Sequence, residues 1–360
     1  MAVAALGLAI AFPIIDASAQ DIAGDDASAY PRLGGNVIFR LAYDGYYQAD
    51  SPRLETNDLF GEMVASPRVD LTDRFSVFTE IRLEGIAPPL EDRFFEDQGI
   101  FVRSLYGTVQ LTDALLLRAG KFTPSFAFAS FATPGMYGNN YNKEIELIER
   151  VGLEAEYTQD LGQFGQHTLT GSAFFDDTTF LSDSLINSRG QKSVDDGGAS
   201  NTETLESFTL SWVGEEFPAL PGFSYKLGFI HEAAGSGDED DENGFALFAQ
   251  QLFDLGEDSS LVVNAELAPV WNFEGSADDT IFASAGTSFQ TGPWLFVLSG
   301  TYRLRDRAGD SNFHDYSVQT AAKHSFPNGF GLEVAHEFNR DENVTAQRFG
   351  VRVIKQFDLD

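Results

Sequence analysis

Apolar and polar side chains alternate with a period of two along most of the chain. In the first such run Val37, Phe39 and Leu41 share one face, while Arg40 and Asp44 share the other. Because successive side chains of a β-strand point to opposite faces, this pattern predicts strands with one apolar face and one polar face.

About sixteen such runs follow one another, most of them near ten residues long, which is enough for a tilted strand to cross a bilayer. The predicted strands cover 36–47, 59–71, 74–86, 101–111, 114–121, 151–159, 167–176, 204–214, 223–232, 245–253, 260–271, 280–290, 294–304, 314–326, 329–338 and 345–357.

The connections between these runs alternate in length. Tight turns are expected at 72–73, 112–113, 291–292 and 327–328. Outer-membrane barrels have short periplasmic turns and longer outside loops, so this sorting predicts a barrel with both termini on the short-turn side. The longer polar loops are 48–58, 87–100, 122–150, 177–203, 233–244, 272–279, 305–313 and 339–344.

The polar face carries too many charges for a dry core, whereas a water-filled lumen holds them without a desolvation penalty. In hydrocarbon every backbone polar group needs a partner, so the sheet must close. We therefore predict an all-β fold, a transmembrane antiparallel β-barrel of about sixteen strands. The predicted pore-lining residues are Arg40, Asp44, Glu80, Arg82, Glu84 and Arg352.

Aromatic residues recur near the ends of the runs, where interfacial girdles of membrane barrels lie. His167, His324 and His336 fall on the apolar phase near strand ends, and we interpret them as interface residues rather than catalytic ones. The expected girdle residues are Tyr43, Tyr47, Tyr157, Trp212, Tyr225, Trp271, Trp294, Tyr302 and Phe357.

The composition narrows the function. The net charge of −32 argues against nucleic-acid binding, which needs cations against phosphates. The chain has no cysteine, which removes disulfides and thiolate metal sites. We expect no cofactor, no metal site and no catalytic residues.

The first residues have the pattern of an export signal, an apolar run ending in Ala17-Ser18-Ala19. The expected organisation is a signal peptide at 1–19, an N-terminal lead at 20–35 and the transmembrane β-barrel at 36–360.

The connection 122–150 is rich in aromatic residues, which would not stay extended in water. We predict that this third outside loop folds into the barrel and narrows it, with one or two helical turns at 144–150. The predicted constriction residues are Arg118, Lys121, Lys143, Glu144, Glu146, Glu149 and Arg150.

The run from Leu117 to Pro124, LRAGKFTP, resembles the RxGKFKxPFG run of the phosphate-selective porin O/P family. Glu149-Arg150 followed by Gly152-Leu153-Glu154 is similar to the segment after that family's constriction loop. The resemblance covers roughly 115–157 and implies a sixteen-stranded channel, commonly trimeric, with its third loop in the pore.

The loops here are acidic, whereas phosphate selectivity in that family resembles a funnel of Lys and Arg. We therefore expect a porin for passive diffusion of ions and small polar solutes, weakly selective or mildly cation-preferring. Its expected partners are these solutes, outer-membrane lipid and lipopolysaccharide, and two further copies in a homotrimer. The alternatives are a barrel enzyme of phospholipase or protease type and an adhesin-like barrel.

Overall fold

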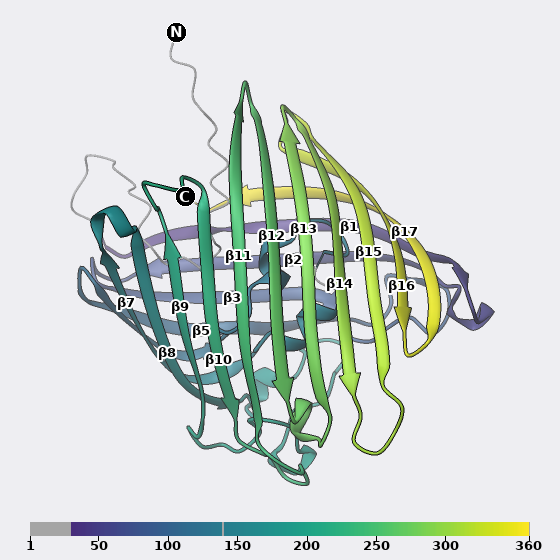
Figure 1. The fold of residues 1–360 in the computed structure, drawn as a ribbon, viewed down its shortest axis with the longest axis horizontal. Helices are drawn as coiled ribbons and strands as arrows, with labels where there is room; N and C mark the ends of the chain where they lie inside the picture. The colour runs from purple at the N-terminus through teal and green to yellow at the C-terminus, as the bar shows by residue number, and fades with distance from the viewer. Residues whose placement is uncertain (1–29, 139, 360) are drawn as a thin grey trace.

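One antiparallel sheet closes on itself to form the wall of the molecule (Figure 1). The computed structural model describes residues 30–138 and 140–359, so the predicted signal peptide at 1–19 lies outside the described residues. β1 (Arg32–Ala49) pairs with both β2 (Asn57–Asp70) and β17 (Val344–Asp358), which removes the free edges. Closure satisfies the backbone of every long strand, as a bilayer requires.

The remaining strands follow in chain order, and each long one is paired with the long strands on either side of it. They are β3 (Phe75–Gly85), β4 (Arg93–Phe94), β5 (Gln98–Thr112), β6 (Leu115–Phe122), β7 (Arg150–Asp160), β8 (Gln166–Asp176), β9 (Ser207–Glu215), β10 (Phe223–Glu232), β11 (Glu242–Gly256), β12 (Ser259–Trp271), β13 (Asp279–Thr291), β14 (Trp294–Asp306), β15 (Phe313–Ser325) and β16 (Phe330–Asp341).

Each predicted strand corresponds to one long strand of the barrel, so the fold prediction is confirmed. The short β4 is an addition, which lies within the connection 87–100 and pairs in parallel with β2. The barrel was predicted to start at residue 36, but β1 begins at Arg32. The first strand therefore includes the last four residues of the segment 20–35 that was predicted to precede the barrel. Gly34 and Gly35 hid this start, since glycine gives no apolar or polar signal, yet Arg32 pairs with Asp70.

The prediction of a longer loop at 339–344 was also wrong. β16 continues to Asp341 and β17 starts at Val344, which leaves a two-residue turn of Glu342 and Asn343. Their φ angles of 47° and 67° are those that a tight hairpin turn with two left-handed residues requires. This hairpin is therefore as tight as the turns at the other end of the barrel.

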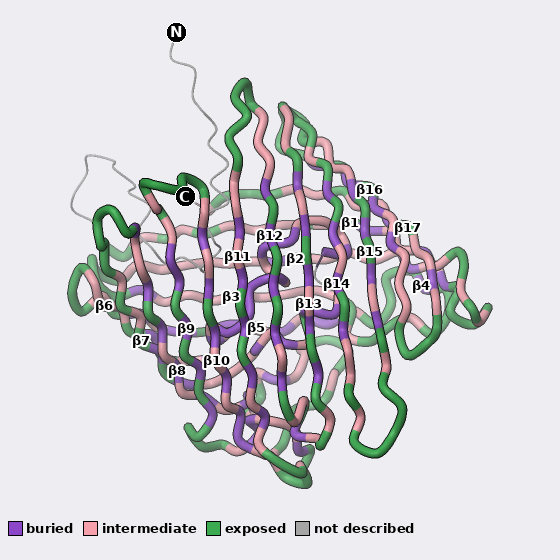
Figure 2. The backbone as a smooth tube through the Cα atoms, in the orientation of Figure 1, coloured by how far each residue is buried: buried purple, intermediate pink, exposed green. Residues whose placement is uncertain are grey.

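Exposed and buried residues alternate along the long strands (Figure 2). The outward side chains are apolar and bare: Phe39 is 47% exposed, Leu41 48% and Leu210 50%. A continuous apolar surface of this extent marks contact with lipid. No helix in the described part of the chain has the length and apolar character to cross a membrane.

Two aromatic clusters on the outer face surround histidines near strand ends. The His167 Nδ1 atom accepts a hydrogen bond from Trp212 Nε1 at 3.0 Å, and the His324 ring lies 4.6 Å from that of Trp294 and 4.5 Å from that of Phe326. Amphipathic rings of this kind belong at the boundary between lipid and water. These contacts favour the interfacial interpretation of both histidines.

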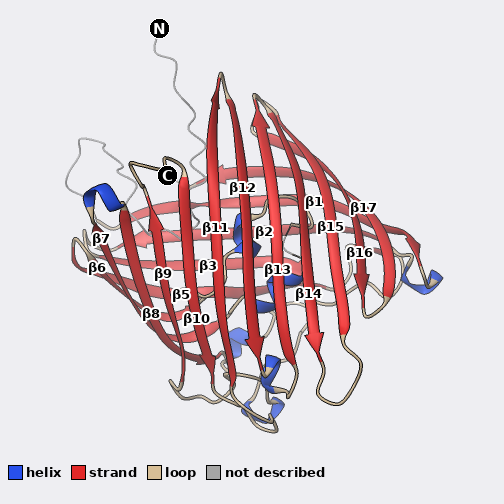
Figure 3. Cartoon of the chain, in the orientation of Figure 1, coloured by secondary structure: helices blue, strands red, loops and turns tan. Residues whose placement is uncertain are grey.

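Strands form the wall, and short helical turns fall in the connections (Figure 3). The turns are η1 (Pro52–Leu54), α1 (Ala129–Ala132), η2 (Tyr141–Ile145), η3 (Gly162–Phe164), η4 (Phe180–Ser182), η5 (Val194–Asp196) and η6 (Phe273–Gly275). The helical turns predicted at 144–150 were misplaced. Arg150 already belongs to β7, where it pairs with Phe122 and Asp176, so the chain must be extended there.

Candidate pore and its constriction

The connection between β6 and β7 is held to the polar face of the wall. The backbone amides of Phe128 and Ala129 donate to Glu266 Oε2 of β12 at 2.6 and 3.0 Å. The Tyr137 amide donates to Gln319 Oε1 of β15 at 2.8 Å, and the Gln319 side chain donates back to the Pro134 carbonyl at 2.9 Å. Buried wall side chains thus satisfy backbone groups that no strand partner serves.

The same segment reaches across to the other end of the sheet. The Tyr137 hydroxyl donates to Asp44 Oδ1 of β1 at 2.6 Å, and Nδ2 of the Asn140 side chain donates to Glu337 Oε1 of β16 at 2.8 Å. The Tyr137 ring also lies 4.0 Å from the Arg348 guanidinium of β17. The segment therefore contacts the inner side of the wall from β12 to β1.

Apolar packing explains why this aromatic segment lies against the wall. Phe126, Ile145 and Leu147 form one buried cluster with Phe174 of β8 and Ile230 of β10. Full burial of such a side chain is worth about 1.5–3 kcal/mol. These apolar side chains interrupt the polar phase of β8 and β10 where the segment covers them.

Arg303 of β14 is a buried cation that contacts three carboxylates, of which Asp315 is buried and Glu144 and Asp341 are 27% and 54% exposed. Its guanidinium lies 2.5 Å from Glu144 Oε1, 2.8 Å from Asp315 Oδ2 and 2.5 Å from Asp341 Oδ1. It also stacks on the Tyr141 ring at 4.4 Å. Burial raises the pKa of the Glu144 carboxyl above its ordinary value, and Arg303 opposes that rise. Arg303 thereby ties η2 to the wall.

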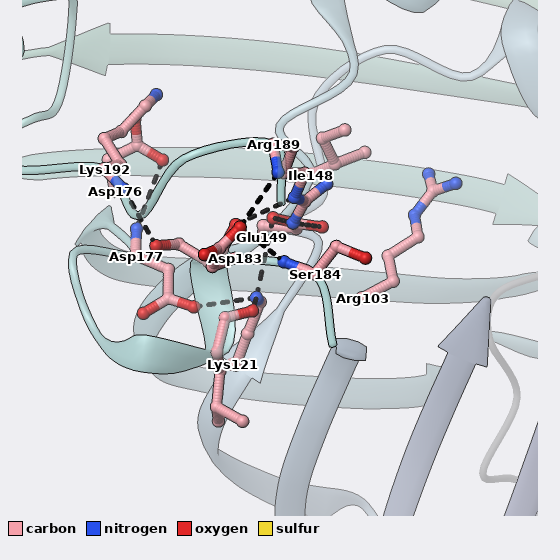
Figure 4. A network of polar contacts seen from close by, with 12 residues as sticks. Arg103, Lys121, Ile148, Glu149, Asp176, Asp177, Asp183, Ser184, Arg189 and Lys192 are labelled. Atoms are coloured by element: carbon pink, nitrogen blue, oxygen red, sulfur yellow. Dashed lines mark hydrogen bonds and ion pairs between the residues drawn. The ribbon is translucent and has the colours of Figure 1, made fainter. Parts of the chain in front are cut away.

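A second cluster joins the end of this segment to the connection 177–206 (Figure 4). Glu149 accepts two hydrogen bonds from Arg189 at 2.8 and 2.6 Å, and Lys121 lies 2.7 Å from Asp177 and 3.5 Å from Glu149. Arg189 lies 3.9 Å over the Phe101 ring of β5. The two longest connections are therefore bound to one another.

Six of the seven predicted constriction residues are held in ion pairs, which the sequence could not show. Lys121 and Glu149 meet in the cluster of Figure 4, and Arg118 pairs with Glu154 within the wall. The others have partners on strands: Glu144 with Arg303, Glu146 with Arg103, and Arg150 with Asp176 and Glu232. Lys143 differs, because its side chain is exposed and no salt bridge to it forms among the described residues.

Lys143 borders a cavity of about 280 Å³ between the loop and the wall. Asp44, Glu62, Arg348 and Arg352 of β1, β2 and β17 form much of its lining. Glu266 is 5% and Glu337 0% exposed, so the loop covers that side of the lumen. The open side is thus bounded by β1, β2 and β17.

Charges of alternating sign follow one another across this open wall. Glu333 lies opposite Lys323 on one side and Arg352 on the other, and Arg40 lies opposite Glu62. Arg352 donates two hydrogen bonds to Glu333, at 3.1 and 2.6 Å. Opposite charges at paired positions stabilise neighbouring strands.

The predicted pore-lining residues fall on this side of the barrel, on β1, β3 and β17. Arg82 pairs with Glu80 and Glu84 at 2.6 and 3.3 Å, with its side chain 23% exposed. Glu62, Tyr137 and Arg348 were missed as site residues. Arg348 shares the phase of Arg352 and was detectable, whereas Tyr137 required the path of the loop.

A second cavity, of about 380 Å³, lies beyond the loop toward the long connections. Its carboxylates come from the loop, β8, β10, β11 and the later connections, and include Glu146, Asp176, Glu232 and Glu242. Arg150 and Lys192 supply its positive charge. An acidic mouth of this kind raises the local concentration of cations.

The same architecture occurs in solved structures. The outer membrane channel DcaP of Acinetobacter baumannii superposes with a TM-score of 0.58 at 15% identity, over 91% of this chain and 97% of that one. The fold is that of bacterial outer-membrane channels. OprB of Pseudomonas putida gives a TM-score of 0.63 at 11% identity, over 91% and 94%, and OpdL of Pseudomonas aeruginosa gives 0.53 at 12%, over 91% and 99%.

Comparison at the level of sequence finds no related protein. No family model matches the chain, and no curated protein matches it. Within the described residues no group of three or more His, Cys, Asp or Glu side chains is placed to hold a metal ion.

Proposed function

We propose that the protein is an outer-membrane porin through which ions and small polar solutes diffuse passively. The observation that carries this proposal is the cavity between the loop and β1, β2 and β17 inside a closed wall with an apolar outer face. Charged side chains on its open side remain partly exposed, as Arg40 at 27% and Glu62 at 23% do. A passage lined in this way suits hydrated solutes and excludes apolar ones.

The pairing of charges supports weak selectivity. Arg118, Lys121 and Arg150 each pair with carboxylates, so they form no uncompensated basic funnel of the kind that phosphate capture needs. The resemblance to the phosphate-selective porin O/P family at 115–157 then extends to the loop and its fold but not to the preferred solute. The acidic mouth favours cations at the entrance.

The same resemblance supports assembly as a homotrimer. The apolar outer face supports contact with outer-membrane lipid, and the acidic loops support bridging to lipopolysaccharide through divalent cations. The segment 1–19 directs export. Cross-linking of the native protein in detergent tests the trimer.

Planar-bilayer recording of the purified protein tests the porin function. We expect stepwise conductance in potassium chloride, with a small reversal potential in a salt gradient. Lipase or protease turnover without conductance would establish the enzyme instead. Binding to cells with neither activity would establish the adhesin.

Lys143 controls the sign of the residual selectivity. Around its cavity Asp44 pairs with Arg348, and Glu62 with Arg40, so Lys143 adds a charge that these pairs leave unbalanced. A unit charge about 6 Å from a passing ion in water is worth roughly 0.7 kcal/mol, or about a threefold change in partition. Lys143→Glu changes the charge by two units and acts in opposite directions on cations and anions, so it is expected to raise the cation-to-anion permeability ratio by roughly tenfold or more.

The reversal potential in a potassium chloride gradient measures this ratio. Lys355→Glu makes the same charge change outside the lumen, where Lys355 donates to the Asn328 carbonyl, and should leave the ratio unchanged. Equal shifts in the two variants would show that overall charge rather than the passage decides selectivity.

A further inference from the structure

A small pocket lies where the first part of the loop meets the strands from β6 to β10, away from the open passage. Its volume is about 80 Å³, and it is open on one side. Arg118, Glu154 and Lys226 line it, and their exposed fractions are 9%, 5% and 6%. Charged side chains this deeply buried need partners, because desolvation without them is costly.

The partners on the described residues are incomplete. The Arg118 Nη1 atom donates to Glu154 Oε1, yet Arg118 Nε and Glu154 Oε2 have no hydrogen-bond partner. The backbone amide of Ser125, which also lines the pocket, interacts with the Glu154 carboxylate. The Arg118 Nε donor therefore has no partner, and the Glu154 carboxylate retains capacity for a further donor in the same small space.

Lys226 adds further donors. Its one hydrogen bond to the described residues is a long one, 3.4 Å from Nζ to the Ala127 carbonyl, and the Phe128 ring lies 5.5 Å away. An ammonium group has three N–H donors, so most of its capacity is unused. Lys226 and Arg118 can therefore both donate hydrogen bonds to the carboxylate of a ligand that lies between them.

Charge balance restricts the ligand further. Glu154 and Glu156 face two cations in this pocket, so a simple anion would meet carboxylates and a simple cation would meet Lys226. Apolar groups of Phe128, Phe131 and Val213 complete the lining. The partner that suits all of these groups has an anionic end, a cationic end and a small apolar body.

We propose that this pocket is a subsite for the head group of a small neutral α-amino acid. The carboxylate lies at Arg118 and Lys226, the ammonium at Glu154, and the side chain projects through the opening. The pocket volume of about 80 Å³ agrees with this assignment. A cavity of about 150 Å³ holds benzene, and a compact charged head group needs about half of that volume. The assignment rests on the proposed porin function and names a class of solute for it.

Ligand-observed NMR of L-alanine with the detergent-solubilised full chain tests the subsite. We expect broadening of the alanine methyl signal, and weaker effects from propionate and ethylammonium, which each carry a single charge. Loss of a charge-assisted hydrogen bond in Lys226→Met should weaken alanine binding roughly tenfold or more. Lys355→Met removes a lysine that lies outside the lumen and does not line this pocket, and should leave binding unchanged.

Val213→Phe fills the pocket without changing its charge, and decides the question if Lys226→Met does not fold. Undiminished alanine binding in a folded Lys226→Met or Val213→Phe variant would overturn the subsite, as would propionate binding as tight as that of alanine. Conductance is recorded on the same samples. Conductance without alanine binding removes the subsite and leaves the porin, whereas absent conductance removes the porin.

Discussion

Deleting residues 126–142 and joining the ends with a short glycine–serine linker is expected to raise the single-channel conductance roughly twofold or more, because barrels of about sixteen strands enclose an aqueous channel when nothing fills them. The deleted residues include Phe126, Phe128 and Tyr137, which lie against β10, β11 and β17. Their removal exposes Glu266 and Gln319 to the lumen. Planar-bilayer recording in potassium chloride measures the change.

A matched deletion of 308–312 shortens the exposed connection between β14 and β15 and should leave the conductance unchanged. Both variants are first checked for the heat-dependent gel shift of a folded barrel. A folded variant lacking 126–142 with wild-type conductance would show that this segment does not limit the passage.

Replacing Arg303 with Met is expected to destabilise the barrel by about 1.5–3 kcal/mol, because the buried Asp315 carboxylate loses one of its two arginine partners and keeps only Arg305. Arg303 is 6% exposed and Asp315 0%, so water cannot replace the lost contact at Asp315. Water can reach Glu144 and Asp341, whose side chains are 27% and 54% exposed. Glu144 would also lose its partner, and η2 would detach from β14. We expect a lower urea midpoint in detergent, together with increased current noise from the freed loop.

Arg307→Met provides the control. Arg307 pairs with Asp310 at 2.9 Å in the exposed connection that follows β14. Exposed pairs of this kind contribute about 0–1 kcal/mol. Its urea midpoint and current noise should match those of the wild type. A stable, quiet Arg303→Met channel would mean that apolar packing alone holds the loop in place.

Both predictions depend on a difference between the wall of the barrel and the loop inside it. The wall is held by backbone hydrogen bonds, whereas the loop is held by side chains. The long strands pair with one another around the barrel and not with the loop at 123–149, so variants that change this loop leave the backbone ladder intact. The loop has no such ladder and depends on side chains such as Glu266, Gln319 and Arg303. Function in this molecule is therefore expected to change more readily than fold.

The sequence alone determined the wall. Phe39 and Leu41 against Arg40, repeated in each run, define which face meets lipid, because strand geometry has a period of two whatever the strand's neighbours are. The strand number and the sorting of connections follow from the same local signal. The prediction of strand ends failed at Gly34 and Gly35, where the alternating pattern is absent. It also failed at Glu342 and Asn343, where two strands extend into a tight turn.

Only the tertiary structure decided the passage. Lys121, Glu149 and Arg150 read as free charges in the sequence, yet partners that lie up to 82 positions away neutralise them. Arg303 collects carboxylates from three separate segments, and Lys143 keeps an exposed side chain on the same loop. Such pairings depend on which strands become neighbours and how the loop crosses them, and a local pattern holds no information about either.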